Sequence, residues 1–204
     1  MIPLEQIRIF FEATRFSHPP GEPPPWANSV ERWYQLDAYA YGFLHAFSRW
    51  KNVGNRPDAI VLASPHASNE TDAAFVRSHG MSPTRFVHTL PNVRSAPLCQ
   101  LLEWSGPVIS VHRDPTTLAY GLGQAIELCL ARMDTVWLLG ALRENEGYLA
   151  YGFQIGAGHG KLCVTKREGP DNVPDDRNLL RRLLDGVTGE TGLVGGYAVR
   201  NVGP

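Results

Sequence analysis

The chain has 204 residues, enough for one sizeable core, and its 19 lysines and arginines nearly balance its 20 aspartates and glutamates. This balance gives no case for binding nucleic acid or an anionic membrane. The three cysteines, Cys99, Cys129 and Cys163, have no close spacing, which argues against a disulfide framework or a zinc site. Because residues 1–11 do not form a signal peptide and no run reaches membrane-spanning length, we expect a single cytoplasmic domain over residues 1–204.

The N-terminal part predicts a strand, a loop and an aromatic helix. Residues 2–11 alternate loosely between apolar and polar side chains, which favours a first strand. The proline-rich segment 16–25 cannot be helix or central strand. Asn28 or Ser29 can cap a following helix whose apolar stripe indicates core packing rather than an acyl-chain pocket or subunit interface. The stripe consists of Trp33, Leu36, Tyr39, Ala40, Phe43, Phe47 and Trp50.

The middle of the chain alternates between strands and helices. Its expected elements are a strand at 59–63, a helix at 72–79 capped by Asn69 or Thr71, a helix at 96–104, a strand at 108–111, a helix at 118–133 and a strand at 135–140. The uninterrupted apolar run of the first strand is typical of a strand buried on both faces of a parallel sheet. The last three elements form a βαβ unit, in which the turn after the first strand is where functional groups usually lie.

The C-terminal part predicts a hairpin, a helix and a glycine-rich tail. The alternating segment 148–155, the glycine-rich turn 156–160 and the strand 161–165 read as a hairpin. A phosphate-binding loop is excluded there, because such a loop precedes a helix and this turn precedes a strand. Asp175 or Asp176 can cap an amphipathic helix over 175–185. The tail, residues 186–204, contains one strand at 197–199.

The turn after the strand 108–111 carries two interpretations. His112 can act as a base oriented by Asp114, with Thr116 or Thr117 as the nucleophile. Alternatively, Asp114 or Thr116 caps the next helix and Pro115 fills its first turn, and we favour this capping interpretation because cap signatures are common. His66, His88 and His112 lack the spacing of a metal site, so we expect no metal. The three cysteines read as buried apolar residues.

Several short motifs, in this order, resemble the N-terminal half of β-ketoacyl synthases, which have the thiolase-like fold. The matching segments are Ala63-Ser64-Pro65-His66 with Thr71, Ser82-Pro83-Thr84-Arg85-Phe86 with Pro91-Asn92, Gly106-Pro107-Val108-Ile109-Ser110-Val111, and residues 119–140. The likeness covers roughly residues 55–168, as judged by the order of elements. It implies an α/β fold equal to one half of a thiolase-like protein, with a mostly parallel five-stranded sheet flanked by helices.

The chain departs from this family at the catalytic residues. In active synthases the strand that resembles residues 108–111 leads to a nucleophilic cysteine, and here Pro115 stands at that place. The catalytic histidines of the family lie in a second half that follows the part resembled here. The resemblance therefore implies a protein without the usual nucleophile and bases, in which a cleft can hold an acyl chain without attacking it. The residues expected to line that cleft are Ser64, His66, Phe86, Asn92, Pro115 and Thr117.

The resemblance implies a non-catalytic subunit that assists fatty-acid or polyketide chain building, in the manner of a chain-length factor. It would form a homodimer or a heterodimer with a ketoacyl synthase through Val108, Ile109, Ser110 and Val111. An acyl carrier protein could present a phosphopantetheine-linked acyl group, and no cofactor of its own is expected. The alternatives are a divergent acyltransferase or thioester hydrolase that uses His112, His88 or His66, and a homodimeric scaffold without a ligand.

Overall fold

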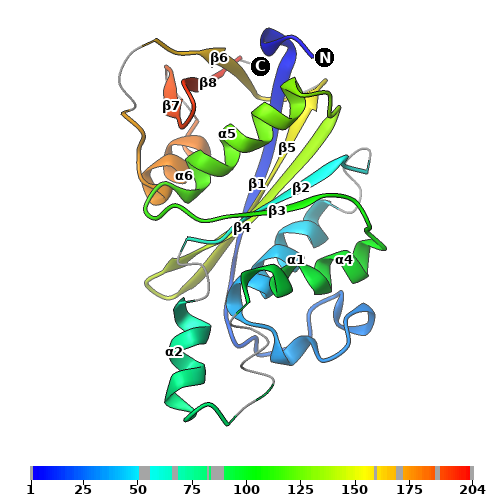
Figure 1. Ribbon diagram of the computed structural model, residues 1–204. Helices are drawn as coiled ribbons and strands as arrows, with labels where there is room; N and C mark the ends of the chain where they lie inside the picture. Colours follow the sequence, from blue (N-terminus) through cyan, green and yellow to red (C-terminus); the bar gives the residue numbers. More distant parts are fainter. Residues whose placement is uncertain are drawn as a thin grey trace.

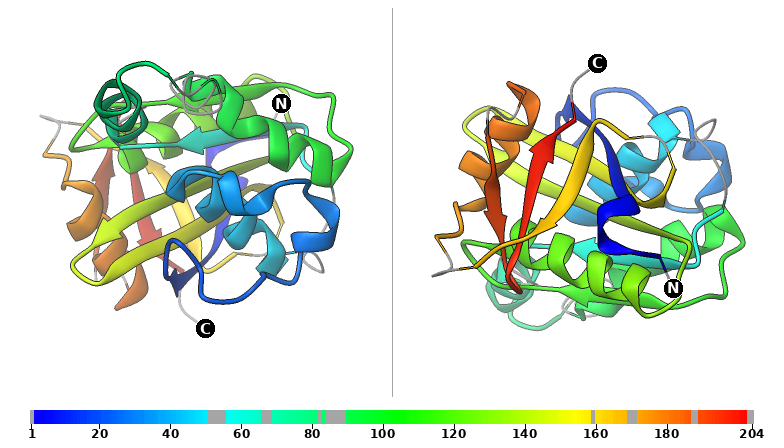
Figure 2. Two further views of the ribbon diagram at one scale, coloured as in Figure 1. Left: turned by 90° about the horizontal axis from the view of Figure 1, so that it is seen from below. Right: turned by 90° about the horizontal axis from the view of Figure 1, so that it is seen from above.

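The computed structural model describes residues 2–50, 56–65, 69–81, 83, 90–158, 160–168, 172–186 and 189–202. Within these residues eight strands form one sheet in the order β3-β2-β4-β5-β1-β6-β8-β7. The strands are β1 (Ile7–Phe16), β2 (Ala59–Ala63), β3 (Val108–Val111), β4 (Thr135–Glu144), β5 (Gly147–Ala157), β6 (Leu162–Lys166), β7 (Thr191–Leu193) and β8 (Tyr197–Asn201). Strands β6, β7 and β8 form the end of the sheet opposite β3 (Figure 2).

The sheet is mixed, so the expectation of a mostly parallel five-stranded sheet is wrong. Among the described strands two pairs are parallel, β2 with β3 and β2 with β4, and the remaining pairs are antiparallel. A tight turn at Asn145 and Glu146 joins β4 to β5, and so short a connection allows only antiparallel pairing. The central βαβ unit is present, however, and all five residues of β2 are buried, as expected for a strand covered on both faces.

The hairpin expected between residues 148–155 and 161–165 does not form. Strand β1 lies between β5 and β6 and pairs with β5 from Ile7 opposite Ala157 to Phe16 opposite Tyr148. The glycine-rich connection passes close to β1, where a Cβ atom on Gly160 would fall 2.7 Å from the carbonyl oxygen of Ile9. The local pattern therefore predicted both strands, β5 and β6, but it wrongly predicted that they pair with each other.

The helices cover both faces of the sheet (Figure 1). They are α1 (Ala38–Trp50), α2 (Asn69–Arg77), α4 (Ala96–Leu102), α5 (Thr117–Leu130) and α6 (Asp176–Leu184), with 3-10 turns η1 (Leu4–Gln6), η2 (Ala27–Ser29), η3 (Trp33–Gln35) and η4 (Pro91–Ser95). A Cβ atom on Gly42 of α1 would fall 2.6 Å from Ala141, and one on Gly121 of α5 would fall 2.7 Å from Leu138. Because Ala141 and Leu138 are an odd number of residues apart on β4, they point to opposite faces. Helices α1 and α5 thus sandwich the sheet.

The helix starts are set by carboxylates. Helix α1 begins later than the predicted cap at Asn28 or Ser29, because Asp37 Oδ1 accepts hydrogen bonds from the backbone N–H groups of Tyr39 (2.8 Å) and Ala40 (3.2 Å). Asp175 caps α6 by accepting from the N–H of Asn178, as predicted. No helix among the described residues is long and apolar enough to cross a membrane.

Candidate functional site

The parallel strands end together and leave a cavity beside β4. The last residue of β2, Ala63, pairs with Val111 at the end of β3 and with Gly140 of β4, which continues to Glu144. A cavity of about 310 Å³ lies at this edge. Its walls come from α1, β4, the segments after β2 and β3, and the start of α6; the lining residues are Tyr39, Pro65, Asp114, Pro115, Leu142, Arg143, Asp175, Asp176 and Arg177. The crevice beyond the carboxyl ends of strands is where open α/β sheets bind ligands.

The bend between β3 and α5 is held by backbone hydrogen bonds. The N–H of Thr116 donates to the carbonyl of Arg113 (2.6 Å), and the carbonyl of Pro115 accepts from the N–H of Asp176 (2.9 Å). The two threonine hydroxyls are also bound to this backbone: Thr116 Oγ1 donates to the carbonyl of Arg113 (3.3 Å), and Thr117 Oγ1 accepts from the N–H of Arg113 (2.9 Å). Pro115 therefore lines the cavity, and the hydroxyls of Thr116 and Thr117 stabilise the backbone of the bend.

His112 is exposed and is attached to the end of β2. Its Nδ1 atom lies 3.1 Å from the carbonyl oxygen of Ser64. Because a carbonyl oxygen only accepts, Nδ1 carries the proton and Nε2 is the basic nitrogen. Among the described residues, the hydrogen bonds of Thr116 and Thr117 run to the backbone of Arg113 and not to this imidazole.

Ser64 belongs to a buried charge network that sequence reasoning missed. Arg94, only 1% exposed, donates from Nε to Asp37 Oδ2 (3.0 Å) and from a terminal nitrogen to Ser64 Oγ (2.9 Å). A further nitrogen lies 3.5 Å from Thr71 Oγ1, and the guanidinium carbon is 5.1 Å from the centre of the Tyr39 ring. The arginine thus ties together α1, the end of β2 and the first turn of α2. A buried charge requires such a partner set, because leaving it unpaired is costly.

The cap of α5 comes from α6 rather than from the bend. Thr116 occupies the N-cap position without a side-chain cap hydrogen bond, and Pro115 precedes the helix. Instead Asp176 Oδ1 accepts from the N–H of Leu118 (2.7 Å). Asp176 is 4% exposed, and burial raises its pKa to about 7; the negative charges of Asp114 and Asp175 add to the effect, while hydrogen bonds from the helix backbone oppose it. Of the two expected cap residues, Asp114 and Thr116, Thr116 occupies the N-cap position but makes no side-chain cap hydrogen bond, and Pro115 precedes the helix rather than filling its first turn.

The residues predicted for the cleft are only partly brought together. Pro115 lines the cavity, Ser64 lies at the end of β2 beside it, and Thr117 is buried beneath the bend. His66, Phe86 and His88 lie outside the described residues, as does the side chain of Asn92. Strand β3 lies at the end of the sheet, with Ser110 exposed and Val111 buried. The sequence indicates Asp176 only as a cap for its own helix, because nothing in the local sequence relates it to the bend 60 residues earlier.

No cysteine is among the described residues that line the cavity. Cys129 and Cys163 are buried, as predicted, and Cys99 is partly buried. Burial raises the pKa of Cys129 to about 12 and also raises that of Cys99, so these groups are held as thiols. The described part of the chain contains no group of three or more histidine, cysteine, aspartate or glutamate side chains arranged to hold a metal ion.

Comparisons with known proteins identify the fold. No protein-family model matches the chain, and no curated protein matches it. Among solved structures, the chain is similar to a chain in the complex of a ketosynthase (ApeO) with its chain length factor (ApeC) from Xenorhabdus doucetiae, with a TM-score of 0.63 and 18% sequence identity. The alignment covers 82% of this chain and 78% of that chain. The chain therefore has a ketosynthase-like fold, as the resemblance of its sequence motifs implied.

Proposed function

We propose that the chain is a non-catalytic ketosynthase-like subunit that pairs with a true ketosynthase and assists the building of an acyl chain. The observation that carries this proposal is Pro115: it lines the cavity at the bend after β3, where the synthases that the sequence resembles keep their nucleophilic cysteine. Proline has no nucleophilic atom. The neighbouring hydroxyls of Thr116 and Thr117 are hydrogen-bonded to the backbone of Arg113 rather than to a base.

The fold supports the pairing part of the proposal. The similar solved structure is a ketosynthase in complex with a chain length factor, and the present chain aligns with most of one chain of that complex. In our proposal the present chain takes the place of the chain length factor. The cavity at the bend would then hold part of the growing acyl chain, which an acyl carrier protein delivers to the partner's cysteine.

The open edge of β3 is the proposed contact with the partner. The carbonyls of Pro107 and Val111 accept hydrogen bonds from the N–H groups of Ile60 and Ser64, so these two positions face β2. Because backbone groups alternate along a strand, Val108 and Ser110 direct their N–H and C=O groups to the opposite, open edge. Among the described strands β3 is an edge strand, and such an edge offers unpaired backbone groups with which a strand of another chain can pair.

The experiment is affinity capture of the tagged chain from cells of its own source. We expect a ketosynthase that carries a nucleophilic cysteine to co-elute in nearly one-to-one amount, as identified by mass spectrometry. The variant Ser110→Pro removes the outward N–H and should release the ketosynthase, whereas the matched control Ser110→Ala keeps that N–H and should retain it. Elution of the wild-type chain alone, or only with copies of itself, would contradict the proposal and favour a scaffold.

A further inference from the structure

A second and larger cavity lies between α6 and one end of the sheet. Its volume is about 730 Å³, within the range of roughly 300–1,000 Å³ that is usual for sites that bind small molecules. Strands β1, β4 and β5 supply the residues of one wall, and α6 supplies those of the other from its first turn to its end. We call this cavity the α6 cleft.

The inner surface of the α6 cleft is apolar. Leu142 of β4 and Leu149 of β5 are paired, so they lie side by side on the sheet wall. Leu180 and Leu184 line the helix wall. Leu142 and Leu180 are buried, but Leu149 is only partly buried and Leu184 is 50% exposed. An apolar ligand segment that covers Leu149 and Leu184 would remove their apolar surface from water, which is favourable.

The rim of the α6 cleft carries three arginines and two carboxylates, which leaves a formal charge of one positive. Arg15 pairs with Glu144 (3.0 Å), and Arg181 pairs with Asp185 (3.6 Å). Arg177 has no ion-pair partner among the described residues, and it donates one hydrogen bond to a backbone carbonyl of β4 (2.9 Å). Because a guanidinium has five N–H donors, Arg177 has donors left for an anion.

The position of Arg177 determines where the anionic end of a ligand lies. Arg177 is in the first turn of α6 and Leu184 is in the last, so roughly 10 Å of helix separates them. Arg177 also lines the smaller cavity at the bend, together with Asp114, Asp175 and Asp176. Negative charge in that smaller cavity opposes an anion there. An anion therefore binds Arg177 from the side of the α6 cleft, and an attached chain runs toward Leu184.

We infer that the α6 cleft binds an amphipathic organic anion, a carboxylate with an unbranched apolar chain, through Arg177 and the leucines of its two walls. The planar guanidinium suits a carboxylate, because the two groups can form two parallel hydrogen bonds. A cationic ligand is disfavoured, since both rim carboxylates already pair with arginines and Arg177 repels it. This inference concerns a different cavity from the one beside Pro115 and does not rest on the proposed pairing with a ketosynthase.

The test compares probes of one chain length that differ in charge: octanoate, octylammonium and 1-octanol. Binding to the full chain is measured by nuclear magnetic resonance on protein with ¹³C-labelled leucine methyl groups, at pH 7.5 and below the concentration at which the probes form micelles. We expect octanoate to shift the methyl resonances of Leu149 and Leu184 and to bind at least about fivefold more tightly than the other two probes. Acetate, which lacks the apolar chain, should bind at least about tenfold more weakly than octanoate.

Three results would overturn the inference. Equal binding of octylammonium or 1-octanol would show that the charge of Arg177 has no role. Binding of octanoate that leaves the methyl resonances of Leu149 and Leu184 unchanged would place the anion elsewhere. No binding of octanoate at millimolar concentration would indicate that the cleft receives another occupant, such as a segment of a protein.

Variants on α6 separate the site from general uptake of the probe. Arg177→Gln should weaken octanoate binding by about tenfold or more, and Arg177→Lys, which keeps the charge but not the planar group, should weaken it less. The matched control is Arg182→Gln, at an exposed arginine of the same helix that is not among the residues lining the cleft, and it should change binding by less than about twofold. Arg177 is exposed, so its variants should unfold at the wild-type temperature. Equal losses for Arg177→Gln and Arg182→Gln would also contradict the inference.

Discussion

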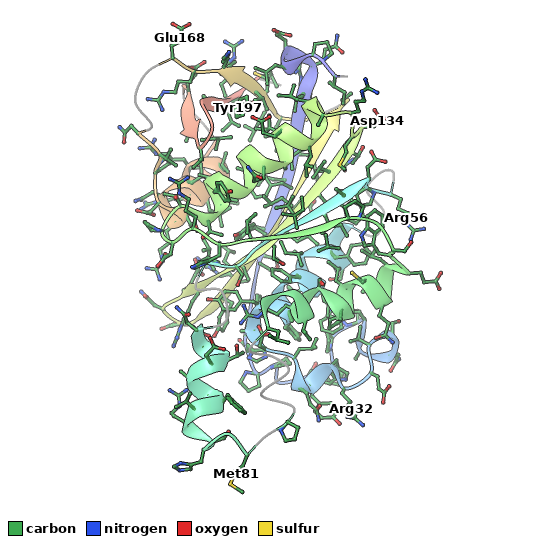
Figure 3. All side chains as sticks on the ribbon, in the orientation of Figure 1. Arg32, Arg56, Met81, Asp134, Glu168 and Tyr197 are labelled. Carbon is green, nitrogen blue, oxygen red and sulfur yellow. The ribbon has the colours of Figure 1, made fainter. Side chains whose placement is uncertain are left out.

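Helices α2 and α5 follow neighbouring parallel strands and start at the same edge of the sheet, but they are built differently. Helix α5 follows β3 and buries nine of its residues, including Leu118, Leu122 and Ile126, against the sheet. Helix α2 follows β2 and buries none. Figure 1 shows α5 lying along the sheet, whereas α2 extends away from it. In Figure 3 Met81, which is 83% exposed, marks the far end of the α2 segment.

The difference shows that two kinds of interaction hold the two helices that follow the parallel strands. Helix α5 is stabilised by apolar burial, whereas α2 is attached by polar contacts at its first turn. These contacts are the ion pair of Glu70 with Arg143 (3.2 Å) and the approach of Arg94 to Thr71. A nine-residue helix is marginal in water without packing, so α2 should be the first helix to open. The position of α5 is fixed by the core, and the position of α2 depends on a few polar groups.

The largest expected effect comes from Arg94, which ties α2 to α1 and to the end of β2. Arg94→Met leaves the buried carboxylate of Asp37 without its main partner and should lower the free energy of unfolding by about 3–5 kcal/mol. Chemical denaturation measures this change. The control is Arg15→Met at the exposed ion pair with Glu144, where we expect a loss of less than about 1 kcal/mol. Equal losses for the two variants would show that burial of the Arg94 pair has no special role.

A second pair of variants compares the helices directly. Leu122→Ala in α5 creates a cavity in the core and should cost about 2–5 kcal/mol of unfolding free energy. Val76→Ala in α2, at a side chain that is 71% exposed, should change it by less than about 0.5 kcal/mol. Hydrogen exchange should also show α2 amides exchanging well before those of α5. Protection of α2 equal to that of α5 in the isolated chain would contradict the comparison.

A smaller effect is expected at Asp176, where α6 caps α5. Its pKa is about 7 in the folded chain against an ordinary value of 3.8, so between these values the folded chain holds a proton that the unfolded chain has released. The free energy of unfolding should therefore fall as pH rises from 4 to 7, and this contribution should level off above 7. Asp176→Asn retains the oxygen that accepts from Leu118 and should be more stable than wild type at pH 8 by about 1–3 kcal/mol, but not at pH 4. Denaturation of both proteins across this range tests the prediction, and a difference that does not change with pH would refute it.

The sequence predicted what is encoded locally. The apolar run at 59–63 identified a strand buried on both faces, and the helix expected at 118–133 is α5 at Thr117–Leu130. The predicted first strand at 2–11 lies instead at Ile7–Phe16, because the alternation of its side chains is weak. The order of short motifs predicted a ketosynthase-like fold, and the similarity to a solved structure supports that fold, although the sheet has eight strands and is mixed.

The features that the sequence did not reveal depend on contacts between distant segments. Strand β1 enters between β5 and β6, although its own pattern contains nothing that selects these neighbours. Arg94 binds Asp37, and Asp176 caps a helix whose first turn lies 58 residues earlier. A buried arginine and a buried aspartate look like surface residues in a sequence, because such residues are rarely buried without partners. Only the folded chain shows that both lie beside the predicted bend.

The most direct test of the central claim is an intact-mass measurement on the chain mixed with its captured ketosynthase and an acyl thioester. We expect the mass of one acyl group to be added to the partner and the mass of this chain to stay unchanged, because Pro115 cannot accept the group. An acyl adduct on this chain, located by peptide mapping to Ser64, Thr116 or Thr117, would contradict the account.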